Sequence, residues 1–292
     1  MILSVSNRTD VVAFYSDWFM NRYNEGYIDV RNPFNEKLVN RIYFEDVDLI
    51  LFCTKNPIPI IDKLKHINKP IIFQVTLTPY KKDIEPNVPP KGEIIEAIKK
   101  ISNIVGVDNL YVRYDPIFIS EKYNINYHIK SFDKLCNYLN GYVKNIIVSF
   151  LDDYKNVRNN KDILKYRNLT SEDYKTIGIN FSRSASKNNM AVQTCCEENN
   201  LVEYGFIKRD CISSELVFKL TGKIIKKWKE RKCGCVQMVD IGVYNSCRHF
   251  CKYCYANYDE NKVLNNYEKH NKNSSLLVGE LQIDDVIKRR LK

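Results

Sequence analysis

The chain has 292 residues, of which 44% are hydrophobic, and it contains ten cysteines. This length predicts one large α/β domain or two small ones, and no apolar run approaches the length of a membrane span. The first residues, Met1–Ser4, contain no basic region followed by an apolar one, so we expect no signal peptide and a cytoplasmic protein. Because the cytosol keeps thiols reduced, the cysteines indicate metal or cluster ligation more than structural disulfides.

The formal net charge is +10, from 45 basic and 35 acidic residues. Such an excess permits a phosphate-bearing or nucleic-acid partner. The chain is also rich in Lys, Asn, Ile and Tyr, a composition that a genome-wide bias would produce without any such partner. The charge therefore leaves both explanations open.

Seven apolar segments typical of β-strands alternate with helical segments along the chain. We expect strands at Ile2–Ser6, Val47–Phe52, Ile71–Leu77, Leu110–Arg113, Asn145–Phe150, Met190–Thr194 and Val236–Val243. We expect helices at Val11–Asn24, Ile60–His66, Glu93–Ser102, Ser131–Leu139, Tyr174–Lys187, Ile212–Lys232 and Ile283–Leu291, and a turn within Asp29–Phe34. This alternation predicts a single α/β domain over residues 1–292, folded as a complete or partial TIM-type β/α barrel.

Several polar side chains follow the expected strands, and in a β/α barrel the carboxyl ends of the strands face the active site. Each has a structural alternative. Thr9 or Asp10 would cap the next helix, and Lys55 would be a solvated loop lysine. Arg113 and Asp115 lie two apart, on one face of a strand, where they would pair with each other. The candidate site residues at these strand ends are Arg8, Asp10, Lys55, Asn56, Arg113, Asp115 and Ser149.

The most informative stretch lies near the C-terminus, where an apolar run leads into Cys247, Cys251 and Cys254, spaced C-x3-C-x2-C. Three thiolates leave one iron of a four-iron cluster without a local ligand, free to bind another molecule. The alternatives are a zinc site with His249 as a fourth ligand, or free buried thiols. The spacing, the aromatic Tyr253 and the preceding strand together favour the cluster.

This stretch resembles the motif of the radical S-adenosylmethionine (SAM) superfamily, C-x3-C-x-(aromatic)-C. In that superfamily the cysteines bind a [4Fe–4S] cluster, SAM chelates the fourth iron, and one electron cleaves SAM to a 5′-deoxyadenosyl radical. The resemblance implies a cluster-binding loop at 244–257, with Tyr253 beside the adenine, and an electron donor such as ferredoxin or flavodoxin. From their places at strand ends alone, Asn56 and Ser149 are candidates for contacts with the cofactor. The catalytic candidates from the same strand ends are Arg8, Asp10, Lys55, Arg113 and Asp115.

The place of the motif departs from the usual pattern, because it normally follows the first barrel strand. We therefore expect a circular permutation, with Val236–Val243 as the equivalent of the first strand and Ile2–Ser6 as the second. The whole chain is also similar to a family of unknown function that carries an S-x-R-T-D-like motif, here Ser6–Asp10, a T-K-N-P motif, here Thr54–Pro57, and the C-terminal cysteine loop.

A second set of cysteines is spread more widely along the chain. In Cys233-Gly234-Cys235, the glycine lets both thiolates face one bound group, and Cys196 is an alternative to Cys195. Four thiolates suit a second iron–sulfur cluster or a structural zinc. The candidate ligands of this second site are Cys195, Cys211, Cys233 and Cys235, whereas Cys53 and Cys136 are expected to be buried thiols.

The sequence thus predicts a radical SAM enzyme that acts on an unassigned substrate. One alternative is a nucleic-acid repair or modification enzyme with the same chemistry. It is motivated by the charge and by Arg113–Pro116, which resembles an arginine–aspartate–proline stretch of spore photoproduct lyase, a radical SAM enzyme of DNA repair. The other alternative is a zinc-stabilised binding protein without catalysis.

Overall fold

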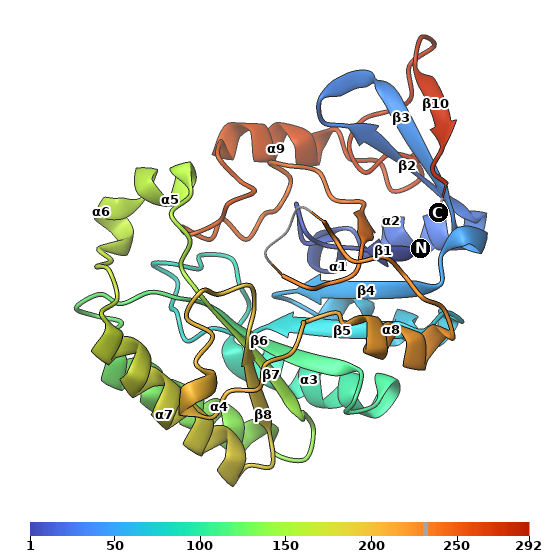
Figure 1. Cartoon of the computed structure of the whole chain (residues 1–292). Coiled ribbons are helices and arrows are strands. Elements are labelled where there is room, and N and C mark those ends of the chain that lie inside the picture. Colours follow the sequence, from blue (N-terminus) through green and yellow to red (C-terminus); the bar gives the residue numbers. More distant parts are fainter. Residues whose placement is uncertain (230–232, 292) are drawn as a thin grey trace.

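Seven parallel strands form the central sheet in a computed structural model that describes residues 1–229 and 233–291 (Figure 1). In space the strands follow the order β8-β7-β6-β5-β4-β1-β9, so β8 and β9 are the edges of the sheet. Their bounds are β1 Ile2–Ser4, β4 Leu49–Thr54, β5 Ile71–Thr76, β6 Leu110–Ile117, β7 Asn145–Phe150, β8 Ala191–Thr194 and β9 Met238–Asp240. All seven predicted strands are confirmed, and the all-parallel sheet with alternating helices is consistent with a partial α/β barrel.

The first and last strands of this sheet along the chain are neighbours in space. Ile2 of β1 lies opposite Leu49 of β4 on one side and Met238 of β9 on the other. The two chain termini also meet: the amino group of Met1 donates to the carbonyl of Asp46 at 2.9 Å, and Arg289 pairs with the Asp46 carboxylate at 2.7 Å. The seven-stranded sheet is therefore spatially continuous from β9, its last strand along the chain, back to β1, its first.

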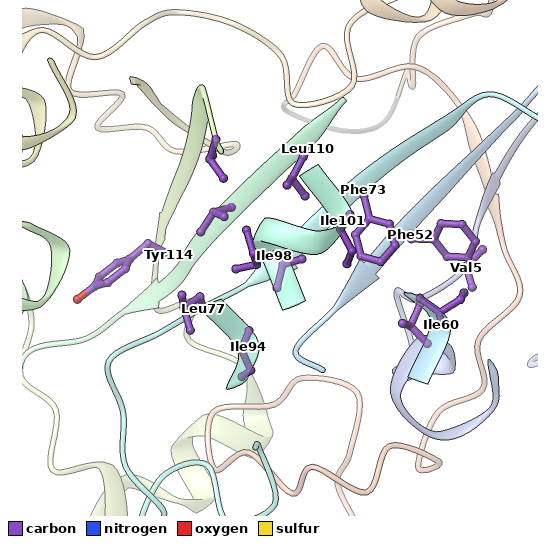
Figure 2. Packing of buried hydrophobic residues seen from close by; sticks show 14 of the residues in the cluster. Val5, Phe52, Ile60, Phe73, Leu77, Ile94, Ile98, Ile101, Leu110 and Tyr114 are labelled. Carbon is purple, nitrogen blue, oxygen red and sulfur yellow. The ribbon is translucent and has the colours of Figure 1, made fainter. Parts of the chain in front are cut away.

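Helices cover the outer face of the sheet. Because α3 carries apolar residues at helical spacing, it packs Ile94, Ile98 and Ile101 against strand side chains such as Phe73 and Leu110 (Figure 2). The helices are α1 Val11–Phe14, α2 Ser16–Glu25, α3 Lys91–Val105, α4 Ile125–Leu139, α5 Lys155–Asn159, α6 Lys161–Leu164, α7 Ser171–Lys187, α8 Ser214–Thr221 and α9 Glu260–Glu268, with a 3₁₀ helix at Ile58–His66.

The opposite, inner face of the sheet is covered by a largely irregular segment, described at residues 195–229 and 233–237, which includes α8. Ile2, Leu51 and Ile72 of the inner face form an apolar cluster with Ile212 and Val217 of this segment. Strand side chains alternate between the two faces. For this reason Gln74 and Arg113 project to the same inner side as Ile72 and Tyr111, closer to the carboxyl ends of the strands.

A second, three-stranded sheet was not predicted. It consists of β2 Tyr27–Asn32, β3 Asn35–Tyr43 and β10 Val286–Arg289. The predicted turn within Asp29–Phe34 is in fact the end of β2 and the hairpin connection to β3. The predicted helix Ile283–Leu291 is wrong, because Val286–Arg289 pairs in parallel with β3, and this pairing outweighs the helical pattern.

The predicted helix Ile212–Lys232 is wrong over most of its length. Only α8 is helical within it, and α8 ends where Gly222 adopts a left-handed conformation with φ of 66°. The last part of that predicted helix, residues 230–232, lies outside the described residues. In the part of the chain that the structure describes, no helix is long and apolar enough to cross a membrane.

Candidate functional site

The loop that carries Cys247, Cys251 and Cys254 follows β9 directly. Two of its residues, Asn245 and Phe250, have left-handed backbones with φ of 52° and 53°, and the backbone N–H of Ala256 donates to the sulfur of Cys254 at 3.3 Å. Burial raises the pKa of the Cys247 and Cys251 thiols, and the negative charge of Asp10 raises the pKa of Cys247 further, whereas Lys55 opposes the rise at Cys251. The three thiols therefore form one group, which we call the triad.

Arg8 ties the end of β9 to the segment after β1. Its Nε lies 2.6 Å from a carboxylate oxygen of Asp240, and its Nη2 donates to the Asp240 carbonyl at 3.1 Å. Gly242 passes so close to this segment that a Cβ there would lie 3.0 Å from the backbone nitrogen of Thr9. The residue must therefore be glycine for the two loops to keep this approach.

Asp10 joins three loops at the carboxyl edge of the sheet. One oxygen, Oδ1, accepts from the backbone of Ala13 and so caps α1, as the structural alternative proposed. The other, Oδ2, accepts from the Thr54 hydroxyl at 2.9 Å and the Lys55 backbone at 2.8 Å, and lies 2.9 Å from Nε2 of His249. Asp10 thus fixes the T-K-N-P loop and the cysteine loop in one place.

His249, which lies between two triad cysteines, is buried and has partners at both ring nitrogens. Besides the contact with Asp10, its Nδ1 lies 3.4 Å from the carbonyl of Asn87. A histidine that ligates zinc must direct one of these nitrogens at the metal. In this structure His249 serves instead as an anchor of the loop.

Glu85 is the centre of a buried charge network beside the triad. Its carboxylate contacts Lys55 at 2.9 Å, the Thr78 hydroxyl at 2.7 Å, Lys91 and the hydroxyl of Tyr253. Burial alone would raise the pKa of Glu85, but Lys55 and Lys91 outweigh it and lower the pKa to about 2. The ammonium of Lys55 also lies 5.2 Å from the centre of the Tyr253 ring. This network positions the aromatic residue of the cysteine motif.

Arg113 and Asp115 pair with each other, at 2.6 Å between Nη2 and Oδ2. The Arg113 guanidinium also donates to the Gln74 side chain at 3.3 Å and contacts the thiol of Cys195, and the charges of Cys195 and Asp115 keep its pKa raised despite burial. The amide nitrogen of Gln74 is buried without a hydrogen-bond partner in the described structure. The inner face at this level is therefore polar and incompletely satisfied by protein groups.

Two predicted cofactor contacts have local partners. The side-chain oxygen of Asn56 accepts from the backbone of Ile58, as in a turn that begins the 3₁₀ helix. Ser149 hydrogen-bonds to Glu197, which also accepts from the Phe150 backbone at 2.9 Å, and burial raises the pKa of Glu197 to about 7. Glu197 follows Cys196 in the chain and was not among the predicted residues.

The second set of cysteines converges on the inner face from three separate segments. Cys195 and Cys235 each hydrogen-bond with Cys211, which lowers the pKa of both, and Cys235 also contacts Cys233. Cys196, which is exposed, contacts Cys233 as well. A pocket of about 600 Å³ adjoins this group and is lined in part by Cys196, Cys211 and Cys233. We call Cys195, Cys196, Cys211, Cys233 and Cys235 the inner thiol group.

No three or more His, Cys, Asp or Glu side chains among residues 1–229 and 233–291 are arranged to hold a metal ion. The donors of the triad are all sulfur, come from one loop and are buried, and the histidine among them is engaged elsewhere. Ligands of a four-iron cluster bind different irons and so stand farther apart than ligands of one ion. Three thiolate donors from one loop are a set that a four-iron cluster can use, with one iron left without a protein ligand.

The chain belongs to the family described as "Domain of unknown function (DUF1848)", whose model matches residues 2–256. This match covers the whole parallel sheet and the triad. No curated protein matches the sequence.

Sequence reasoning missed four residues that build the site: Glu85, Asp240, His249 and Glu197. Glu85 lies in a proline-rich loop after β5, which gave no strand-end signal. Asp240 was not considered as a strand-end residue, because its strand was predicted to continue to Val243. His249 was considered only as a metal ligand, although its place inside the motif was visible.

Proposed function

We propose that the protein is a radical SAM enzyme in which Cys247, Cys251 and Cys254 hold a [4Fe–4S] cluster. The observation that carries the proposal is the position of the triad. It follows the edge strand β9 at the carboxyl edge of the sheet, where Asp10 joins it to the ends of β1 and β4. When bound, such a cluster with SAM on its fourth iron supplies the electron that cleaves SAM to a 5′-deoxyadenosyl radical.

The order of the strands supports a circular permutation. From the edge that carries the triad, the sheet runs β9-β1-β4-β5-β6-β7-β8. The strand before the cysteine loop is therefore first in space although it is last in the chain, and β1 is second. This is the order expected if the superfamily's first strand was moved to the end of the sequence.

The chain's own residues orient the bound groups and exclude water. Tyr253 contacts Glu85 and Lys55, which would fix its ring in the cluster-binding loop, beside the adenine of a bound SAM. Asp10 holds the loop through His249 and is a positioning residue. Arg113 and Asp115 project from the inner face toward the space where a substrate would lie, and their pairing avoids an isolated buried charge.

The proposed reaction also needs a one-electron donor of the ferredoxin or flavodoxin class. The alternative of a nucleic-acid or other phosphate-bearing substrate has only the net charge of +10 in its favour. Arg113, the residue that motivated it, is neutralised by Asp115. Binding to DNA or RNA that weakens steeply with salt would support this alternative, and the absence of binding at low salt would exclude it.

Reconstitution tests the proposal directly. The protein is treated anaerobically with iron and sulfide, and its EPR spectrum after reduction is recorded with and without SAM. We expect cluster binding and a change of the signal on addition of SAM, both absent in a variant with all three triad cysteines replaced by alanine. A wild-type spectrum that SAM leaves unchanged would contradict the proposal.

A further inference from the structure

The inner thiol group has no role in the function proposed above. Its cysteines belong to three segments that are distant in sequence: the end of β8, the stretch before α8 and the stretch before β9. Cys211 and Cys235 are 6% exposed, and Cys195 and Cys233 are partly buried. None of the five is in a disulfide. Free thiols gathered in this way are typical of ligands.

The irregular segment that covers the inner face of the sheet, which we call the covering segment, would be stabilised most by a cross-link at this position. Residues 195–237 contain one short α-helix, α8, and a 3₁₀ turn at Val202–Tyr204, and the rest of the segment is irregular where it is described. An irregular segment loses much conformational entropy when it is fixed on a sheet and recovers little through regular backbone hydrogen bonds. A group bound by thiols from its beginning, middle and end would fix the whole segment.

The local chemistry is that of a negatively charged sulfur site. The backbone N–H of Ile212 donates to the sulfur of Cys235 at 3.5 Å, and the amide of Gln193 donates to that of Cys211 at 3.9 Å. The guanidinium of Arg113 contacts Cys195. Below them lies the apolar inner face of the sheet. Hydrogen bonds to sulfur and a nearby cation compensate the negative charge of a thiolate-bound cluster.

The arrangement of the thiols favours a cluster over a single ion. In a four-thiolate zinc site every sulfur lies about 2.3 Å from the metal, so each sulfur is close to all the others. Here the four thiols come from three separate segments, and the described residues contain no group of three or more side chains arranged around one ion. The adjoining pocket of about 600 Å³ gives more room than one ion needs.

We propose that the inner thiol group binds a second iron–sulfur cluster, with Cys195, Cys211, Cys233 and Cys235 as ligands. Cys196 is the fifth thiol and the one that is exposed, so it is not required. The backbone N–H of Gly234, which lies between Cys233 and Cys235, donates to the carboxylate of Asp210 at 2.9 Å. A Cβ at Gly234 would collide with that carboxylate. This fixes the C-x-C turn beside Cys211. The proposal does not rest on the function of the triad.

The test uses the full chain in which all three triad cysteines are replaced by alanine, purified and reconstituted anaerobically. We expect about four irons and four sulfides per chain, with visible absorption that SAM does not change. Adding Cys211→Ser or Cys195→Ser to this variant should remove the iron, whereas adding the neighbouring Cys196→Ser should leave it. Circular dichroism of each variant shows whether the fold persists.

Three outcomes would overturn the proposal. The first is one zinc and no iron in the triad variant, and the second is a disulfide among the inner thiols with no metal. The third is iron that survives Cys211→Ser and Cys195→Ser in variants that remain folded. Because the triad is absent from all these proteins, none of the outcomes depends on SAM cleavage, and failure of this proposal is distinct from failure of the proposed function.

Discussion

The two groups of cysteines are held in place in different ways. The triad lies in one loop, and side chains from the ends of neighbouring strands anchor that loop: Arg8 through Asp240, Asp10 through His249, and Glu85 through Tyr253. The inner thiol group is distributed over an irregular segment that packs on the sheet through an apolar cluster. The triad loop is thus anchored by hydrogen bonds and ion pairs, whereas we propose that the covering segment is fixed further by the group that its thiols bind.

The largest expected effect comes from removing one triad thiol. Cys251→Ala should abolish 5′-deoxyadenosine formation, because two thiolates cannot hold a cluster that has one open iron. The matched control is Cys136→Ala, which removes a buried thiol of α4 that belongs to neither group. Product analysis by chromatography checks both variants. Activity that survives Cys251→Ala would remove the triad from the mechanism.

The buried Glu85 network predicts a pH dependence of stability. The pKa of Glu85 is lowered from an ordinary value of 4.5 to about 2, so its contribution is complete above pH 4.5 and is lost as the pH falls toward 2. The full contribution corresponds to about 3 kcal/mol in the free energy of unfolding. Urea unfolding of the metal-free protein between pH 3 and 6 measures the part of this contribution that is lost above pH 3, about 2 kcal/mol. In Glu85→Gln this part of the pH dependence should disappear, and parallel curves for the two proteins would contradict the network.

Asp10→Asn tests whether the triad loop is organised without metal. Asp10 accepts from Ala13 through Oδ1 and from Thr54 and Lys55 through Oδ2, and an amide has only one accepting atom, so the contacts on one of the two sides are lost. We expect the free energy of unfolding of the metal-free protein to fall by about 2 kcal/mol. By comparison, Cys211→Ser should have its main effect in the metal-loaded protein. If Asp10→Asn lowered the free energy of unfolding only in the metal-loaded protein, the triad loop would not be organised without metal.

A smaller effect is expected for Gly242→Ala. The added Cβ would lie 3.0 Å from the backbone of Thr9, so the loops after β1 and β9 must move apart by a few tenths of an ångström, at a cost of about 1 kcal/mol. The control is Gly92→Ala in α3, where nothing lies within 4 Å, and alanine should stabilise the helix by about 0.5–1 kcal/mol. Thermal unfolding of the two variants should therefore shift in opposite directions. A shift of the same sign in both would contradict the close approach of the two loops.

The parallel sheet was predictable because each of its strands is a continuous apolar run, which buried parallel strands require. The small sheet was not, because β10 has exposed side chains and pairs with β3, far away in sequence. The cysteine groups were predictable by spacing and residue type. The anchors were not, because Glu85 and Asp240 acquire their partners only through folding, and an isolated acidic residue in a loop carries no sequence signal. Asn56 and Ser149 have local partners in the structure, and their contact with a cofactor stays a prediction.

The most direct test of the central claim is the cleavage of SAM by the reconstituted protein. Wild-type protein is incubated anaerobically with SAM and dithionite, without added substrate, and the nucleoside products are separated and identified by mass. The proposed function predicts slow formation of 5′-deoxyadenosine that requires the reductant and is absent from the variant without triad cysteines. A fully cluster-loaded protein that forms no 5′-deoxyadenosine under these conditions would contradict it.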